Sequence, residues 1–146
     1  MGHWQTFYHL VWGTKNRLPL IDEERDRLIQ QSIRATCAKQ DAFVFAIGAM
    51  PDHAHLAVSI PPAIAVAEFM RLIKGASSHL INKVSALSAH QTFAWQAEYG
   101  VFTFGERSLN DVRDYVMNQR KHHAEGSLLP NFERLQRLDR PSNAQP

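Results

Sequence analysis

Residues 42–60 have the sequence AFVFAIGAMPDHAHLAVSI, in which two apolar runs flank Pro51-Asp52. Proline followed by aspartate is a frequent turn signal, and the residues after it alternate with the period of two that strands show. The stretch predicts two antiparallel strands, Ala42 to Met50 and His55 to Ile60, joined at this turn. Pro61-Pro62 ends the second strand, because proline lacks the backbone N–H that a strand needs.

The rest of the chain supplies the other elements of an α+β domain. Trp4 to Trp12 alternates aromatic and apolar residues and is expected to be a strand, followed by a helix from about Asp22 to Gln40 with an acidic start. Ala65 to about Leu87 is expected to be a long helix, and Phe93 to Phe104 to hold short extended pieces. A last helix is expected from near Leu109. This order predicts a ferredoxin-like (RRM-like) α+β fold, an antiparallel sheet with helices packed on one face.

Length and composition agree with one small domain. A chain of 146 residues with 45% hydrophobic content can bury one core, so we expect a single domain over residues 1–138 and a mobile C-terminal tail over residues 139–146. The single cysteine, Cys37, excludes a disulfide framework. No secretory signal is evident and no apolar run approaches the roughly 20 residues of a membrane span, so a cytoplasmic protein is expected.

His53 and His55 are separated by one residue in a predicted strand. Residues two apart lie on the same face of a sheet, so the two imidazoles lie side by side and can bind one metal ion. The alternative is that both are half-buried polar residues of a strand without a ligand.

A second group of polar residues lies on the last predicted helix. Its apolar residues follow helical spacing: Leu109, Val112 and Val116. Ser108 with Asp111 resembles a capping box with aspartate in place of glutamate, which predicts the start of the helix. Tyr115 and Gln119 then lie one turn apart on one face. The alternative is a tyrosine at the edge of the core and a solvated glutamine.

Five segments, taken in order, resemble the successive blocks of the single-tyrosine HUH transposases, which include the IS200-like and REP-associated enzymes. These segments are YHLVWGTKNR (8–17), MPDHAHL (50–56), LIKGASSHLI (72–81), FAWQAEYGVF (93–102) and YVMNQRKHH (115–123). The resemblance covers roughly residues 3 to 138 and implies the ferredoxin-like fold. It also implies a metal-dependent enzyme that nicks and rejoins single-stranded DNA at hairpin-bearing sites. Ala54 departs from the pattern, since a larger aliphatic residue is common between the histidines.

The resemblance implies a role for each residue of the two groups. Tyr115 is the expected nucleophile, whose hydroxyl takes the 5′ side of the break and forms a 5′-phosphotyrosine. His53, His55 and Gln119 are the expected ligands of a divalent metal, Mg or Mn, which polarises the scissile phosphate. Imidazole and amide oxygen do not select one metal by themselves, so the choice of Mg or Mn rests on the family.

DNA contacts must come from local clusters, because 16 Lys and Arg against 14 Asp and Glu give a formal net charge of only +2. The candidates are Lys15, Arg17, Arg71, Lys74, Ser78, Asn82, Arg120 and Lys121. Four of them form a polar stripe on the long middle helix: Arg71, Lys74, Ser78 and Asn82. Each cluster has an ordinary alternative as a solvated face. Five aromatic residues can stack on unpaired bases, although most must be core in a domain of this size: Phe7, Tyr8, Trp12, Phe93 and Trp95.

Expected partners are single-stranded DNA with hairpins or palindromic repeats and a second copy of the chain. The family implies a homodimer with paired edge strands, in which the tyrosine helix of one subunit can lie beside the histidine pair of the other. Two other functions are open. A domesticated protein would bind DNA hairpins without cutting, and a small metallohydrolase would use the same ligands but leaves Tyr115 unexplained. The intact set of His53, His55, Tyr115 and Gln119 favours the enzyme.

Overall fold

Four antiparallel strands form one sheet in the computed structural model, which describes residues 3–85 and 91–119. The strands are β1 (Tyr8–Gly13), β2 (Phe43–Met50), β3 (His53–Ser59) and β4 (Gly100–Thr103), in the order β2-β3-β1-β4. The helices are α1 (Glu23–Lys39), α2 (Val66–Val84) and α3 (Leu109–Met117), and two short 3-10 turns are η1 (Lys15–Arg17) and η2 (Glu106–Ser108). The order β1-α1-β2-β3-α2-β4 is that of the ferredoxin-like sandwich, which confirms the predicted fold class.

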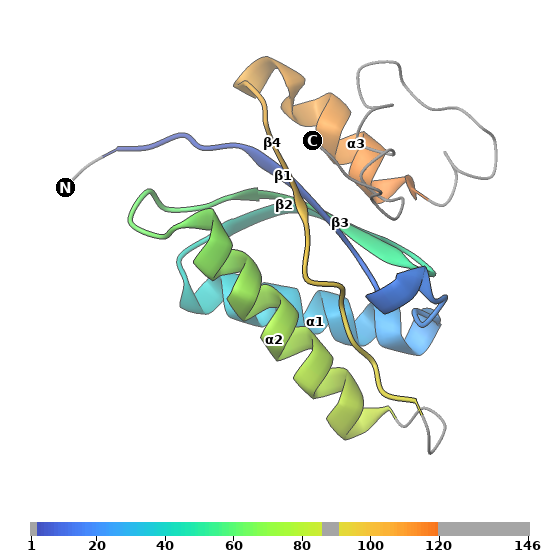
Figure 1. Ribbon diagram of the computed structural model, residues 1–146. Coiled ribbons are helices and arrows are strands. Elements are labelled where there is room, and N and C mark those ends of the chain that lie inside the picture. The colour runs from blue at the N-terminus through green and yellow to red at the C-terminus, as the bar shows by residue number, and fades with distance from the viewer. Residues whose placement is uncertain (1–2, 86–90, 120–146) are drawn as a thin grey trace.

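The two faces of the sheet carry different helices. Helices α1 and α2 lie together on one face, and α3 lies alone on the other (Figure 1). The period of two in β1 and β3 decides which residues meet which helices. Leu10, Trp12, Leu56 and Val58 belong to the large core under α1 and α2. On the opposite face a small cluster of Ala46, Ala57, Val112 and Val116 joins α3 to the sheet.

Several predicted boundaries shift in the structure. β1 begins at Tyr8 rather than Trp4, and Trp4 is 43% exposed. β3 begins at His53 rather than His55, so both histidines belong to the strand, and His53 pairs with Met50 across the turn. Asp22 caps α1 as its acidic start suggested, since its side chain accepts a hydrogen bond from the backbone N–H of Arg25 at 2.9 Å.

The predicted capping box of α3 is wrong. Ser108 precedes the helix but makes no side-chain capping hydrogen bond. The physical reason is that η2 runs directly into α3, so Ser108 already has a helical backbone with φ −92° and ψ −2°. A capping side chain needs an extended backbone to turn back onto the first helical N–H groups.

The described helices include none that is long and apolar enough to cross a membrane. Cys37 is a free, buried thiol on α1. The predicted tail, residues 139–146, lies outside the described residues, as does the part of the predicted domain that follows Gln119.

Candidate functional site

Three histidines gather on the face of the sheet that α3 covers. His53 and His55 come from β3, and His9 comes from β1, the neighbouring central strand. All three are buried, with exposed fractions of 2%, 0% and 1% for His53, His55 and His9. The ring centroids of His53 and His55 are 5.0 Å apart, and those of His9 and His55 are 5.1 Å apart. The predicted side-by-side pair is therefore present, with a third imidazole next to it.

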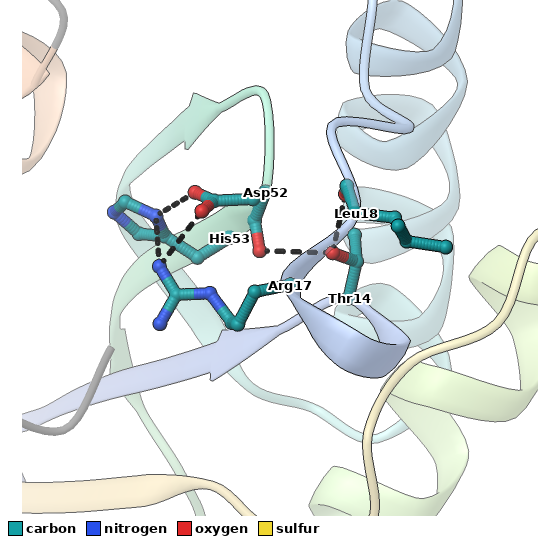
Figure 2. A network of polar contacts seen from close by, with 5 residues as sticks. All are labelled: Thr14, Arg17, Leu18, Asp52 and His53. Atoms are coloured by element: carbon teal, nitrogen blue, oxygen red, sulfur yellow. Dashed lines mark hydrogen bonds and ion pairs between the residues drawn. The ribbon is translucent and has the colours of Figure 1, made fainter. Parts of the chain in front are cut away.

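The His53 ring is held by the turn before it. Its Nδ1 lies 2.7 Å from Oδ1 of Asp52, and Arg17 Nη2 lies 3.1 Å from Oδ2 of the same carboxylate (Figure 2). Burial would raise the pKa of Asp52, but the hydrogen bonds from His53 and Arg17 outweigh it and lower the pKa to about 2. Asp52 is therefore a carboxylate at neutral pH and accepts a hydrogen bond from the Nδ1–H group of His53. This arrangement matches the carboxylate–histidine pairs that orient metal-binding imidazoles.

Arg17 reaches Asp52 because the chain turns sharply after β1. Asn16 and Arg17 have positive φ values of 57° and 55°, an uncommon backbone for residues other than glycine. Thr14 ties this turn down, since its Oγ1 lies 2.7 Å from the carbonyl oxygen of Leu18 and 3.2 Å from that of Asp52 (Figure 2). Arg17 was predicted to contact DNA; in the structure its guanidinium binds Asp52 inside the site.

The His55 ring is held by another histidine. Its Nδ1 lies 2.9 Å from Nε2 of His9, within hydrogen-bond distance. Burial lowers the pKa of His9 to about 4, so the His9 imidazole is neutral near pH 7. Sequence reasoning did not select His9. One signal was available in the sequence. His9 alternates with the core residues Leu10 and Trp12 in its predicted strand, so its side chain lies on the opposite face of the sheet from them.

Tyr115 and Gln119 both lie in this region. The Tyr115 ring centroid is 6.1 Å from that of His55 and 6.2 Å from that of His9, in edge-on contacts with both. Tyr115 and Gln119 are each 1% exposed, so the alternative of a solvated glutamine is wrong. Gln119 Nε2 donates to the backbone carbonyl of Tyr115 at 3.0 Å. Within the described part of the chain, Gln119 Oε1 is buried without a hydrogen-bond partner.

Gly48 is the reason that α3 can lie so close to the sheet. A Cβ atom at this position would lie only 1.9 Å from the carbonyl oxygen of Val116 in α3. Gly48 pairs with His55 across β2 and β3, so the close approach occurs directly beside the histidine site. The same imagined Cβ lies 3.4 Å from Cγ of Gln119, which places the glutamine next to the strand position opposite His55.

The donor set fits a divalent metal. Nδ1 of each predicted ligand imidazole is engaged by a protein group, so Nε2 is the nitrogen that would bind metal. The buried amide oxygen of Gln119 lacks a protein donor among the described residues and suits a hard cation such as Mg or Mn. Over the described ranges no three His, Cys, Asp or Glu side chains form a metal cluster of their own. The predicted ligand set of His53, His55 and Gln119 stays a prediction.

The predicted DNA stripe on α2 has mostly internal partners. Lys74 Nζ donates to the backbone carbonyls of Gln96, Ala97 and Glu98 at 2.8, 3.0 and 2.9 Å. Asn82 makes two hydrogen bonds with the backbone of Phe93. A lysine has three N–H donors, and all three of Lys74 are used. These two residues therefore hold the segment before β4 against α2.

The other candidates for DNA contact differ in exposure. Ser78 Oγ donates to the carbonyl of Lys74 within the helix, and Arg71 forms a two-point ion pair with exposed Glu68. Lys15 is exposed on η1. Arg120 and Lys121 lie outside the described residues. Their contact with DNA stays a prediction. Two of the aromatic candidates, Trp12 and Phe93, are 1% and 2% exposed and belong to the core.

Comparison with known proteins gives matches to transposases. Residues 3–119 match the family model described as transposase, IS200-like. The chain is 26% identical over 119 residues to the ISDra2 transposase TnpA of Deinococcus radiodurans, covering 80% of this chain and 85% of that protein. It is also 26% identical over 130 residues to the transposase for insertion sequence element IS200 of Salmonella typhimurium, covering 86% and 84%.

Two solved structures share the fold. A candidate transposase from Deinococcus radiodurans superposes with a TM-score of 0.63 at 24% identity, over 82% of this chain and 95% of that one. A REP-associated tyrosine transposase bound to a REP hairpin superposes with a TM-score of 0.62 at 14% identity, over 100% and 94%. The chain therefore shares its overall fold with these two solved proteins.

Proposed function

The chain belongs to the IS200-like transposase family, and from that premise we propose that it nicks and rejoins single-stranded DNA through a covalent 5′-phosphotyrosine. The observation that carries the proposal is the contact of Tyr115 with buried imidazoles of its own chain, on the sheet face that also holds His53. A phenol packed against His55, one of the proposed metal ligands, suits this chemistry, because a nucleophile must meet a phosphate whose charge is neutralised nearby.

In the proposed reaction the Tyr115 hydroxyl attacks the scissile phosphorus in line with the 3′ oxygen. The bond from Tyr115 to phosphorus forms as the bond to the 3′ oxygen breaks. The phenol proton is lost to a base and the departing oxygen takes up a proton, which leaves a free 3′-hydroxyl. Because the phosphotyrosine keeps the energy of the phosphodiester, a 3′-hydroxyl can reverse the step on the same strand or on another strand without ATP.

His53, His55 and Gln119 would hold a divalent ion, Mg or Mn, which would supply charge neutralisation at the phosphate oxygens. The protein's own part is to fix the ligands. Asp52 and Arg17 orient the His53 ring, and the hydrogen bond from Gln119 Nε2 to the Tyr115 carbonyl turns the amide oxygen away from its own helix. One observation supports metal binding by these residues: Gln119 Oε1 is buried and has no hydrogen-bond partner among the described residues.

The proposed substrate is single-stranded DNA that carries a hairpin or palindromic repeat. Support comes from the structurally similar REP-associated transposase, which is bound to a REP hairpin. Exposed Lys15 would contact phosphates, and so would exposed Arg71 if it exchanged its ion pair with Glu68 for a phosphate; such contacts position the strand rather than select its sequence. We also propose a homodimer, because β2 and β4 are the edges of the sheet and pairing of an edge with a second copy would cover it.

The test is to incubate the protein with end-labelled, hairpin-bearing single-stranded DNA and Mg or Mn, and to look for an adduct that survives denaturation. His53→Ala should abolish the adduct and leave hairpin binding nearly intact, because affinity for DNA comes mainly from phosphate and base contacts elsewhere. His79→Ala, at an exposed histidine of α2, is the matched control and should behave as wild type. Undiminished cleavage by His53→Ala, or in excess chelator, would refute the metal assignment. Tight hairpin binding without any adduct would identify a non-cleaving binding protein instead.

A further inference from the structure

One buried imidazole is not used by the proposed reaction. His9 lies on β1, is 1% exposed, and contacts both His55 and Tyr115 through its ring. We propose that His9 is a positioning residue for the metal site. Its Nε2 accepts a hydrogen bond from the Nδ1–H group of His55, which fixes the orientation and the tautomer of the His55 ring. This inference rests on the proposed function, since it assigns a partner to one of the proposed metal ligands.

The strand register brings the two rings together. His9 pairs with Ala57 in the antiparallel ladder of β1 and β3, so His55 is its diagonal neighbour on the same face. Diagonal side chains on one face of a sheet lie within reach of ring-sized groups. The resulting distance between His9 Nε2 and His55 Nδ1 is 2.9 Å. This distance is that of a hydrogen bond between the two ring nitrogens.

The direction of this hydrogen bond follows from the chemistry of a metal ligand. An imidazole that binds a metal through Nε2 carries its proton on Nδ1, because the neutral ring has one N–H and one lone pair. His55 must then donate from Nδ1, and His9 must accept at Nε2. A neutral His9 that accepts at Nε2 carries its own proton on Nδ1. That nitrogen is buried and has no hydrogen-bond partner among the described residues.

The two proposed ligands therefore have unequal outer partners. His53 has the carboxylate of Asp52, supported by Arg17, and His55 has the neutral ring of His9. Outer partners of this kind hold a ligand ring in place before the metal arrives, and their loss typically weakens metal binding by about 10- to 100-fold. A histidine that served only to fill space would have no such effect, provided that its replacement kept the packing.

The experiment measures Mn²⁺ binding by the full-length, metal-free protein, from the free-ion electron paramagnetic resonance signal. His9→Phe keeps an aromatic ring against His55 and Tyr115 but removes the acceptor. His9→Gln returns an acceptor, because its amide reaches about as far as Nε2 of histidine, whereas the shorter amide of His9→Asn ends near the position of Nδ1. His79→Phe removes a histidine of α2 and controls for adventitious binding.

We expect His9→Phe and His9→Asn to bind Mn²⁺ about 10- to 100-fold more weakly than wild type, and His9→Gln to recover most of that loss. Thermal unfolding without metal shows whether each variant is folded, and the comparison of Gln with Asn holds even if Phe disturbs the packing. If both His9→Phe and His9→Asn bound Mn²⁺ with wild-type affinity, the inference about His9 would be wrong but the metal site would not be. His53→Ala is the reference for loss of the metal site. No binding of Mn²⁺ by wild type would overturn the metal site and this inference together.

Discussion

At the scale of single residues, the most consequential feature is the burial of Tyr115. Its side chain is 1% exposed and lies edge-on to His55 and His9. A phosphodiester can reach its hydroxyl only after neighbouring groups move. The proposed nucleophile is therefore shielded from solvent in this structure.

Replacement of Tyr115 by phenylalanine removes one oxygen and keeps the ring contacts with the two imidazoles. We expect Tyr115→Phe to fold, to bind Mn²⁺ and to bind the hairpin, yet to form no covalent adduct. Peptide mapping of the wild-type adduct should place the nucleotide on Tyr115. Tyr99→Phe is the matched control, because the Tyr99 ring contacts Lys74 of α2, the helix on the opposite face of the sheet, and this variant should cleave normally. A label on Tyr8 or Tyr99 would refute the mechanism.

The site residues that the sequence predicted are those tied together by short spacings. His53 with His55, and Tyr115 with Gln119, share faces because of the periods of strand and helix, and the resemblance joined the two pairs. His9 and Asp52 were missed for different reasons. The contact of His9 with His55 depends on the register of β1 against β3, which no spacing within one strand reveals. Asp52 looked like a turn residue, and it is one, while its carboxylate also holds His53.

At the scale of elements, the packing of α3 on β2 depends on one missing side chain. In Gly48→Ala the new Cβ would meet the carbonyl oxygen of Val116 at 1.9 Å, so α3 must move away from the sheet. We expect a loss of about 1–3 kcal/mol in the free energy of unfolding, as for other overpacked positions, and a much larger fractional loss of adduct formation. Hairpin binding should change little. Chemical denaturation and the adduct assay measure the two effects.

Gly75→Ala is the control for this change, because nothing lies within 4 Å of the Cβ it would add on α2. It should leave adduct formation unchanged and raise the free energy of unfolding by about 1 kcal/mol, since alanine favours helix over glycine. If Gly48→Ala cleaved as well as Gly75→Ala, the position of α3 would not matter to the reaction.

Variants of Lys74 and Lys15 distinguish a lysine that stabilises the fold from one that contacts DNA. Lys74→Met keeps the length of the side chain but removes the donors to three backbone carbonyls, which should lower the free energy of unfolding by about 1–3 kcal/mol. Lys15→Met, at an exposed position of η1, should leave stability unchanged and weaken hairpin binding instead. Urea titrations and binding at two salt concentrations measure both. Equal stability of the two variants would show that the carbonyl contacts contribute nothing.

The existence and order of the elements were predictable, and their ends were less so. The strands around Pro51-Asp52 and the helix after Asp22 followed from alternation, turn residues and charge. The capping box at Ser108 failed because a 3-10 turn upstream had already set its backbone. The polar stripe on α2 was correctly placed on one face, but the sequence cannot show that residues 93–99 lie against that face and use its donors.

At the scale of the whole molecule, the tyrosine helix packs against the histidine strand of its own chain. A mixture of Tyr115→Phe and His53→Ala chains then has no intact site in any subunit, even within a homodimer. We expect the mixture to form no more adduct than either variant alone, measured at micromolar protein after the subunits have exchanged. Recovery of adduct in the mixture would show instead that the sites are shared between subunits. Sedimentation of the same samples gives the oligomeric state.

The three histidines sit on β1 and β3, the two strands that have neighbours on both sides, whereas the nine residues of α3 rest on a small apolar patch. Parts of a protein with few buried contacts open at lower free energy than its central strands. We therefore expect α3 to unfold locally at a lower temperature than the central strands β1 and β3. Amide protons of α3 would exchange with solvent first and those of β1 and β3 last. In the proposed mechanism, Tyr115 on α3 would then move with any DNA strand bound to it, while His53 and His55, the proposed metal ligands, keep their positions in the sheet.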